Sequence, residues 1–251
     1  RAKPAKNGNS RSKSQLTRQH LKKNVLLNGL DGAHVDAVLA SGAVVKLGTR
    51  QAIYEPGAPI KDVYFPTTSM LSVVTRLKDG EMIEIGTVGR EGTSGIPLIF
   101  GASTTANDSY CQVPGEAIKI PAKLFQRLHA ESVPFRRLLD RYVQAYINLL
   151  GQLAACNRLH SVLERCARWL LMTQDRVTGD VLPLTHEYLA MMLGTRRSGV
   201  TIAAATLRTA GFIRYSQGTI TILDREGLES SACECYDVAR DQFAGLLRTL
   251  A

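Results

Sequence analysis

Two adjacent arginines, Arg196 and Arg197, carry the most specific binding chemistry in this sequence. They stand in the stretch LGTRRSGVT, directly after Gly194, and are followed by Ser198 and Thr201. A guanidinium group can donate two parallel hydrogen bonds to a carboxylate, a phosphate or the edge of a guanine base. What these side chains bind therefore depends on the element that presents them.

The stretch predicts two helices separated by a turn. Thr185 is a good N-cap for the first helix, and Gly194 ends it because glycine tolerates a left-handed backbone. Thr195 is expected to cap a second helix that runs to about Thr209. One face of that second helix is apolar and consists of Val200, Ala203, Ala204 and Leu207. The other face turns arginine and small polar residues outward.

Two helices joined by a glycine turn, with arginines on the first turn of the second, are typical of a helix-turn-helix. The segment RYSQGTITIL then predicts two strands that would form a wing, and residues 158–223 contain eight arginines against four acidic residues. We expect the outward face to bind double-stranded DNA and the two helix N-termini to face phosphates. The expected DNA-binding residues are Thr185, Thr195, Arg196, Arg197, Ser198, Thr201, Ile202 and Arg208. The alternative is a structural helix pair with solvated arginines.

Further toward the N-terminus, residues 43–121 read as short strands rich in β-branched and aromatic side chains, with glycine and proline at the corners. This pattern predicts a compact antiparallel β-roll, similar to a jelly roll. A short helix in DGAHVDAVLASG should precede it and end at Gly42. With the helices that follow, the fold class is α+β.

A long helix is predicted over residues 134–158, because apolar residues recur there at alternating spacings of four and three. The expected dimerisation seam is Leu139, Tyr142, Tyr146, Leu149, Leu153 and Cys156. A second apolar stripe, Val143, Ile147, Leu150 and Ala154, lies beside it. One stripe can cover the roll while the other meets a second copy of the chain. The alternative is a single core helix.

Composition adds little about function. The chain has 251 residues, of which 45% are hydrophobic, and a net charge of +9. Eight of its 31 basic residues lie within residues 1–30, which contain no acidic residue, so 23 basic residues face 22 acidic ones in the rest. Residues 1–23 are predicted to be a basic disordered tail. No segment reads as a membrane helix or secretory signal, so we expect a cytoplasmic protein that contacts no membrane.

The predicted domain order follows from these elements. After the tail come a β-roll sensor domain at 24–133, the dimerisation helix at 134–158, a winged helix-turn-helix at 159–230 and a C-terminal extension at 231–251.

The five cysteines do not read as a disulfide framework, because their number is odd and their spacing irregular. Cys233 and Cys235 form a C-x-C pair, but the sequence shows no second ligand pair of the kind that makes a zinc site convincing. No metal site is therefore predicted. Cys156, on the expected seam, is the thiol to test for redox sensitivity, although inert packing is the simpler role. No catalytic constellation is recognisable, so no enzyme activity is predicted.

The order of roll, long helix and LTHEYLAMMLGTRRSGVTIAAATLRTAGFI resembles the Crp/Fnr family of bacterial transcription regulators over about residues 24–230. The resemblance implies a homodimer that binds an inverted repeat, and RNA polymerase as a partner if the protein is an activator. It places Arg196, Arg197, Ser198 and Ile202 at the positions that read bases. Ile202 departs from the long polar residue often found there, so the operator sequence cannot be transferred.

The resemblance does not extend to the family's cyclic-nucleotide pocket. Ile96 follows Gly95 where a glutamate would fall, and no Lys or Arg occurs between Glu91 and Ala117. A buried phosphate without a cation is costly, so binding of cyclic AMP in the usual way is not expected. Glu84, Arg90 and Glu91 are candidates for another effector pocket, and the effector is unknown.

No cofactor is expected either. The family's iron-sulfur members need thiolates in their N-terminal part, and no cysteine precedes Cys111. Haem needs an axial ligand, and no histidine lies between His34 and His129. The competing hypothesis is a ligand-binding sensor or enzyme whose C-terminal domain is an interaction module.

Overall fold

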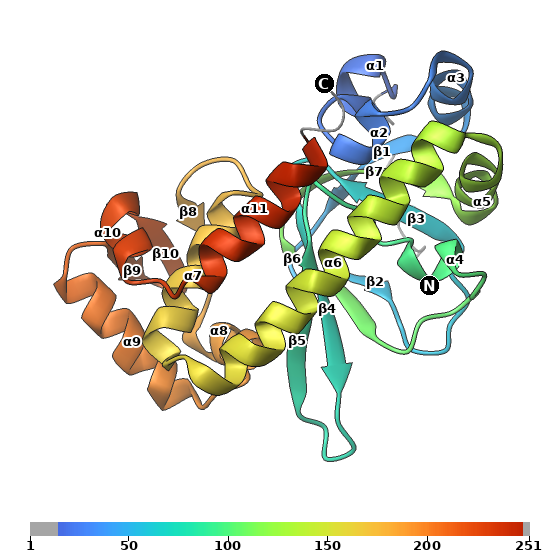
Figure 1. Cartoon of the computed structure of the whole chain (residues 1–251). Helices are drawn as coiled ribbons and strands as arrows, with labels where there is room; N and C mark the ends of the chain where they lie inside the picture. The colour runs from blue at the N-terminus through green and yellow to red at the C-terminus, as the bar shows by residue number, and fades with distance from the viewer. Residues whose placement is uncertain (1–14, 248–251) are drawn as a thin grey trace, which may run out of the picture.

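The computed structural model describes residues 15–247, which form an N-terminal roll and a C-terminal domain joined by one long helix (Figure 1). The roll contains the strands β1 (Ala43–Leu47), β2 (Ala52–Tyr54), β3 (Asp62–Pro66), β4 (Met70–Arg76), β5 (Met82–Val88), β6 (Asp108–Val113) and β7 (Gly115–Pro121). Its helices are α1 (Arg18–Leu21), α2 (Val25–Asn28), α3 (Gly32–Ser41), α4 (Ile96–Ile99) and α5 (Ala122–Glu131).

The seven strands form two antiparallel sheets with the orders β1-β7-β3 and β2-β6-β4-β5. This arrangement confirms the predicted antiparallel roll, and α3 ends before Gly42 as expected. The core between the sheets and α5 includes Phe65, Ile118 and Phe125, which have no exposed surface. Buried and half-buried side chains alternate along most of β3, because one face of the strand lies on this core.

The structure describes only the last part of the predicted tail at residues 1–23. Residues 1–14 lie outside the described residues, whereas residues 15–23 are folded, and their assignment to a disordered tail is wrong. Leu16 and Leu21 are buried in the hydrophobic core, and Arg18 forms an ion pair with Asp36 at 2.8 Å. Two leucines at the right positions therefore attach this basic segment to the roll.

The long helix α6 (Val133–Leu159) runs diagonally across the molecule between the two domains (Figure 1). Ser132 caps it by accepting a hydrogen bond from the Phe135 amide, and Pro134 occupies its first turn. Tyr142 and Tyr146 lie against the roll, where a Cβ atom on Gly92 or Gly86 would overlap their hydroxyl groups.

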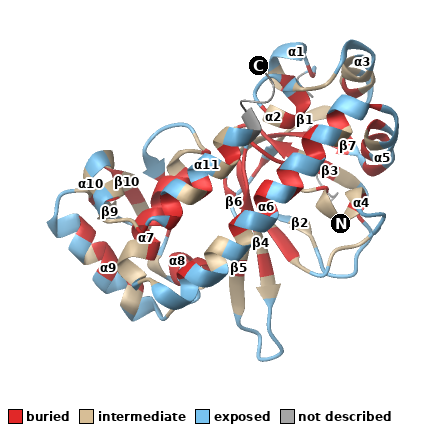
Figure 2. Ribbon diagram, in the orientation of Figure 1, coloured by how far each residue is buried: buried red, intermediate tan, exposed pale blue. Residues whose placement is uncertain are grey.

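The predicted dimerisation seam is covered by the protein's own chain, so its assignment to a second copy is wrong. Tyr142 and Tyr146 lie against the roll, whereas Cys156 lies against Cys233, which precedes the final helix. Five of its residues are buried within one chain (Leu139, Tyr142, Tyr146, Leu149 and Cys156), and Leu153 is half-buried. The glycines of the roll leave room for this side of the helix, and a seam already covered cannot meet a partner. Figure 2 shows the buried stripe along α6.

The second stripe of α6 divides between inside and outside. Val143 is buried and Leu150 half-buried, whereas Ile147 is 55% exposed and Ala154 is exposed. Gly151 lies between the two exposed residues on the same face and is also exposed. The free side of α6 therefore has a narrow apolar strip.

The C-terminal domain consists of α7 (Val162–Gln174), β8 (Val181–Leu182), α8 (His186–Leu193), α9 (Arg197–Thr209), β9 (Ile213–Ser216), β10 (Thr219–Ile222) and α10 (Arg225–Ser230). A capping box between Ser161 and Glu164 starts α7 directly after α6 ends. The three strands form a small antiparallel sheet in the order β8-β10-β9. The predicted wing strands are therefore present.

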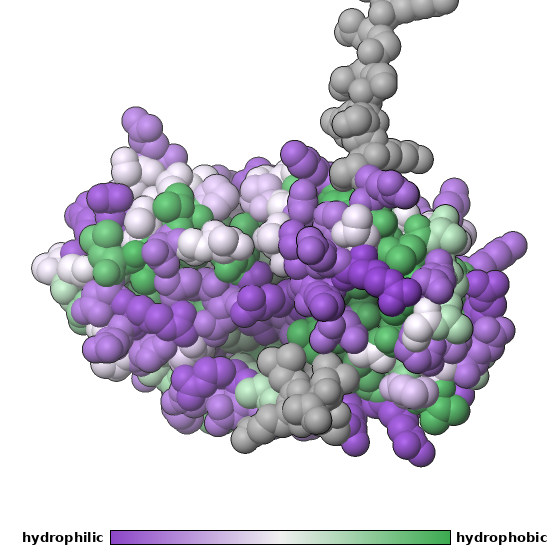
Figure 3. Space-filling model, turned by 90° about the horizontal axis from the view of Figure 1, so that it is seen from above, coloured by the Kyte–Doolittle hydropathy of each residue, from purple (hydrophilic) through white to green (hydrophobic). Residues whose placement is uncertain are grey.

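The final helix, α11 (Cys235–Leu247), returns from this domain and lies along α6 (Figure 1). Asn148 of α6 donates a side-chain hydrogen bond to Gln242 of α11 at 3.0 Å, and Tyr236, Ala239 and Phe243 are buried. Seen from above, the molecular surface has a broad hydrophilic belt with hydrophobic patches between its charged side chains (Figure 3). Within residues 15–247 no helix combines the length and apolar character that a membrane span requires.

Candidate nucleic-acid interface

The break between α8 and α9 is built by the backbone of Gly194 and Thr195. Gly194 has φ +56° and ψ +47°, the left-handed conformation predicted for the end of the helix. Its amide donates to the Met191 carbonyl at 3.2 Å, and the Thr195 amide donates to the Ala190 carbonyl at 3.0 Å. These two bonds form a Schellman motif, which satisfies the last carbonyls of α8.

The two predicted N-caps differ in outcome. Thr185 caps α8 as expected, because its side chain accepts a hydrogen bond from the Tyr188 amide at 3.1 Å. Thr195 does not cap α9, because it belongs to the Schellman motif that closes the preceding helix. The N-cap is Arg196, which has extended backbone angles and makes no side-chain cap. The first amides of α9 are thus without a side-chain cap.

The faces of α9 separate as the sequence predicts. Val200, Ala203, Ala204 and Leu207 are buried, and the outward residues Arg196, Arg197, Ser198, Thr201, Ile202 and Arg208 are exposed. Ile202 is 69% exposed and is the one large apolar side chain among these outward residues. The side chains of Arg196, Arg197 and Arg208 make no hydrogen bond or ion pair within residues 15–247.

A contact that the sequence did not reveal joins the two helices to the wing. The His186 ring, at the start of α8, stacks on Tyr215 of β9 with centroids 4.1 Å apart. Its Nδ1 lies 3.1 Å from the Thr201 hydroxyl, which donates to the Arg197 carbonyl at 3.0 Å. Burial, and then the charge of Arg197, lower the pKa of His186. A neutral histidine therefore fixes the wing against the first turns of both helices.

The wing itself is a two-stranded hairpin that ends at Gln217 and Gly218. Gln217 has φ +48° and Gly218 has φ +75°, a turn that joins β9 and β10 directly. Arg214, Ser216 and Gln217 are exposed on it. The methyl group of Thr185 lies close to Gly218, so the wing turn and the start of α8 are neighbours.

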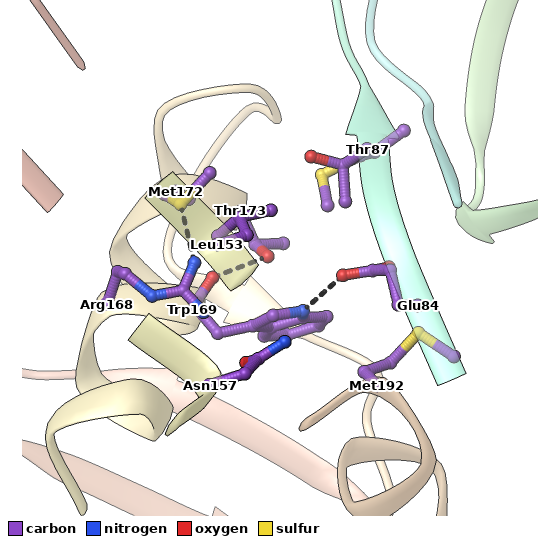
Figure 4. Close-up of a pocket in the computed structure, with 10 residues that line it drawn as sticks. Glu84, Thr87, Leu153, Asn157, Arg168, Trp169, Met172, Thr173 and Met192 are labelled. Atoms are coloured by element: carbon purple, nitrogen blue, oxygen red, sulfur yellow. Dashed lines mark hydrogen bonds between the residues drawn. The ribbon is translucent and has the colours of Figure 1, made fainter. Parts of the chain in front are cut away.

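The predicted effector residue Glu84 lies between the roll and the C-terminal domain, not in a pocket of the roll. Trp169 of α7 donates its indole N–H to the Glu84 carboxylate at 2.9 Å (Figure 4). Ser72 of β4 donates to the other carboxylate oxygen. Burial is the main cause that raises the pKa of Glu84 to about 7. Glu84 is therefore a contact between domains.

The other two predicted effector residues are at a separate place. Glu91 pairs with Arg176 of the C-terminal domain at 2.7 Å, with both side chains buried, and Arg90 is exposed beside it. Both line a groove of about 430 Å³ between the roll, the end of α7 and α11, whereas Glu84 does not. The grouping of Glu84 with Arg90 and Glu91 in one pocket is wrong, because each carboxylate has its own partner from the C-terminal domain.

The roll has an internal cavity of about 150 Å³, which is lined by Tyr54, Ser94, Asn107 and Tyr146 among others. No lysine or arginine is among its lining residues. A phosphate placed there would have no cationic partner among these residues.

An exposed basic helix, the helix and turn before it and the two-stranded wing after it define a winged helix-turn-helix protein. Residues 164–231 match the Crp-like helix-turn-helix domain. No curated protein sequence matches the chain.

Several solved structures share the fold, and one of them is a CRP-family transcriptional regulator. FixK2 from Bradyrhizobium japonicum is 15% identical with a TM-score of 0.65, over 76% of this chain and 98% of that one. A CRP-family transcriptional regulator from Thermus thermophilus, TTHB099, is 20% identical with a TM-score of 0.62, over 75% and 96%. The c-di-GMP responsive regulator CLP from Xanthomonas campestris is 18% identical with a TM-score of 0.59, over 76% and 99%. The C-terminal domain therefore matches a Crp-like helix-turn-helix, and the chain as a whole shares the fold of these solved structures.

Proposed function

We propose that this protein is a homodimeric transcription regulator that places α9 of each subunit in the major groove of an inverted-repeat operator. The observation that carries the proposal is the outward face of α9, where three guanidinium groups lack any partner within the described residues. The face opposite is packed into the domain core, so α9 cannot turn these arginines inward. A regulator of this kind acts in the cytoplasm, where the DNA is.

Each exposed side chain suits a particular part of the duplex. Arg196 and Arg197, on the first turn of α9, can bind guanine edges through two parallel hydrogen bonds, and Ser198 can bind a base or a phosphate. Ile202 has no polar group, so its natural partner is the C5-methyl group of thymine. Arg208, at the other end of α9, suits a phosphate contact.

The start of α8 offers a second phosphate contact. The Thr185 side chain caps one of the first amides of α8, and its methyl group lies close to Gly218 of the wing turn. Partial positive charge at a helix N-terminus favours an anion. This contact would fix the position of the domain on the duplex without reading its sequence.

The dimer interface that we propose is the free face of α6, in place of the buried seam. Ile147, Gly151 and Ala154 are exposed on that face at spacings of four and three, the repeat of a two-stranded helix pair. Small residues at the second and third positions allow two helices to approach closely. A two-fold axis along α6 would place the two α9 helices about 34 Å apart, one turn of the DNA duplex.

The signal that controls the protein is, in our proposal, not cyclic AMP bound in the roll. The absence of any lysine or arginine from the lining of the roll cavity supports this, because a cyclic phosphate needs a cation or several donors. If the protein activates transcription, RNA polymerase is the partner that it recruits.

Selection of sites from random duplex DNA by the purified protein tests the proposal. We expect an inverted repeat whose half-sites are one helical turn apart. Arg197→Ala should weaken specific binding by roughly 1 to 3 kcal/mol and relax the base preference at one position in each half-site. Arg127→Ala removes the same charge from exposed α5 of the roll and should leave the preference unchanged.

Ile202→Ala tests the thymine contact in the same assay. It should reduce the preference for thymine at one position, whereas Leu223→Ala, which removes an exposed apolar side chain away from the wing turn, should not. The proposal fails if the wild-type protein enriches no sequence at moderate salt. If Arg197→Ala changes only the salt dependence, Arg197 is a phosphate contact and not a base reader.

A further inference from the structure

Four metal-ligating side chains from distant segments meet at the junction of the long helix and the C-terminal domain. Cys156 lies near the end of α6 and His160 directly follows that helix, while Cys233 and Cys235 stand where α11 begins. The sulfur atoms of Cys156 and Cys233 are 3.5 Å apart, and Cys235 Sγ is 3.5 Å from His160 Nδ1. All four ligand atoms lie within 4.8 Å of one another.

The packing of α11 along α6 brings them together. The C-x-C pair lacks a second ligand pair in its own part of the sequence, and the long helix supplies one from more than seventy residues away. Cys156 and His160 are four residues apart, so one turn of helix places both on the side of α6 that faces α11. The three thiols are buried as a small cluster of their own, separate from the main core.

We propose that these four side chains bind one Zn²⁺ ion as a Cys₃His site. Zinc binds sulfur at ~2.3 Å with tetrahedral geometry, so its ligand atoms lie roughly 3.8 Å apart. The distances of 3.5 Å and the overall spread of 4.8 Å fit one ion at the centre of the cluster. Three cysteines and one histidine are a ligand set of structural zinc sites, and the thiols release their protons when the ion binds.

The residues around the cluster hold its ligand atoms in the orientation that a zinc site requires. The Nε2 atom of His160 lies 3.2 Å from the Glu234 carboxylate, which accepts a hydrogen bond from Nε2–H and so leaves the lone pair of Nδ1 facing the sulfur atoms. A carboxylate behind a ligating histidine fixes its tautomer and strengthens it as a ligand. Gln152 of α6 donates a hydrogen bond to Cys235 Sγ at 3.0 Å, as an amide beside a thiolate would.

Two buried arginines beside the cluster supply the charge that such a site needs. Arg165 and Arg168 of α7 are buried, each has an Nε without a hydrogen-bond partner, and neither pairs with a carboxylate within residues 15–247. A zinc ion with three thiolates and a neutral histidine carries one net negative charge, which offsets buried positive charge.

A disulfide between Cys156 and Cys233 explains fewer of these features. The disulfide would not explain why His160 pairs with Glu234 or why Cys235 lies beside the other two thiols. It would also leave both arginines without an anion nearby. A zinc ion uses every one of these groups. It would also tie α11 to the end of α6 where α7 begins, and so fix the position of the DNA-binding domain.

Metal titration of the full chain tests this inference. Protein stripped with a chelator under reducing conditions is titrated with Zn²⁺ against a coloured competitor, and with Co²⁺. We expect about one ion per chain, and cobalt spectra with thiolate charge transfer and the intense visible bands of a tetrahedral site. Cys235→Ser should weaken zinc binding at least about 100-fold, because it removes a direct ligand, and Glu234→Gln by up to about tenfold.

Three further variants separate loss of the site from loss of the fold. His160→Cys keeps four ligands and should still bind zinc, whereas His160→Ala should not. Cys111→Ala, in β6 of the roll, should bind zinc like the wild type. Substoichiometric zinc with no tetrahedral cobalt spectrum overturns the inference, as does unchanged affinity in Cys235→Ser. A Cys156–Cys233 disulfide in protein alkylated at lysis, without zinc binding after reduction, assigns the cluster to redox chemistry.

Discussion

Glu84 accepts hydrogen bonds from both domains, from Ser72 in the roll and from Trp169 in α7. Its raised pKa means that the folded protein favours the protonated form more than the unfolded chain does. Protonated Glu84 therefore adds to the free energy of unfolding. This contribution is fully present below pH 4.5 and is lost as the pH rises through about 7. The contact that Glu84 makes between the domains is therefore sensitive to pH.

We predict that Glu84→Gln removes this sensitivity. Glutamine keeps the shape of the side chain and an oxygen that accepts hydrogen bonds, but does not ionise. The free energy of unfolding of the wild type should fall, relative to the variant, by on the order of 3 kcal/mol between about pH 5 and pH 8. Urea denaturation of both proteins at the two pH values measures the difference. A difference that stays constant with pH would show that Glu84 does not titrate in this range.

The exposure of a single side chain could be predicted from the sequence, but its distant partners could not. The outward position of Arg197 and Ile202 follows from the helical period and the apolar residues between them, which are local signals. Glu84, Glu91 and Cys156 each have a partner in the C-terminal part of the chain that is more than seventy residues away. No local pattern encodes such contacts, which is why the sequence alone suggests an effector pocket and a dimer seam for these residues instead.

At the scale of elements, the turn between α8 and α9 depends on one glycine. Gly194 has a positive φ, and a Cβ atom there would also overlap Ile83 of β5. Gly211, after α9, has φ +82° with no atom near the position of a Cβ. The two glycines therefore differ in the steric contact but share the backbone requirement.

Gly211→Ala should destabilise the protein by about 1 kcal/mol, the cost of a left-handed backbone. Gly194→Ala should cost more, because Ile83 must also move, and should weaken DNA binding as the turn shifts. Thermal unfolding and binding to a selected operator measure both effects. Adding Ile83→Ala should recover part of the binding that Gly194→Ala loses. Equal losses in the two single variants would show that the contact with β5 is unimportant.

Elements are easier to predict than the neighbours against which they pack. The strands of the roll, the wing and the long helix could be located because each has its own period and its own turn residues. The spacing of the apolar residues along a long helix does not reveal what the helix packs against. The same apolar stripe can pack against a β-roll or against a second copy of the helix. Thr195 is a similar case, because a threonine after a C-terminal glycine can cap the next helix or close the previous one.

For the whole molecule, the predicted assembly depends on the exposed face of α6. Ile147→Glu would place a charge in the proposed interface without disturbing the subunit, because the side chain is mostly exposed. We expect a dimer by analytical ultracentrifugation for the wild type and a monomer for this variant. Specific operator affinity should fall at least about 100-fold, since two linked sites bind much more tightly than one.

Leu77→Glu is the matched control, an exposed leucine beyond β4 of the roll that should change neither property. A monomeric wild type, or a dimeric Ile147→Glu with intact operator affinity, would contradict the proposed interface. In that case another surface would have to supply the two-fold axis.

The path of the backbone limits how the recognition helix can move. The chain enters the C-terminal domain at Ser161 and leaves it again through α11, which runs back beside the helix by which it came. Two helices, α6 and α11, therefore connect the C-terminal domain to the rest of the molecule. A rotation of this domain requires both helices to bend together. A chain cut just before Cys233 would lose the second connection, and α6 and contacts between the domains such as those of Glu84 and Glu91 would then hold α9 in its orientation without α11.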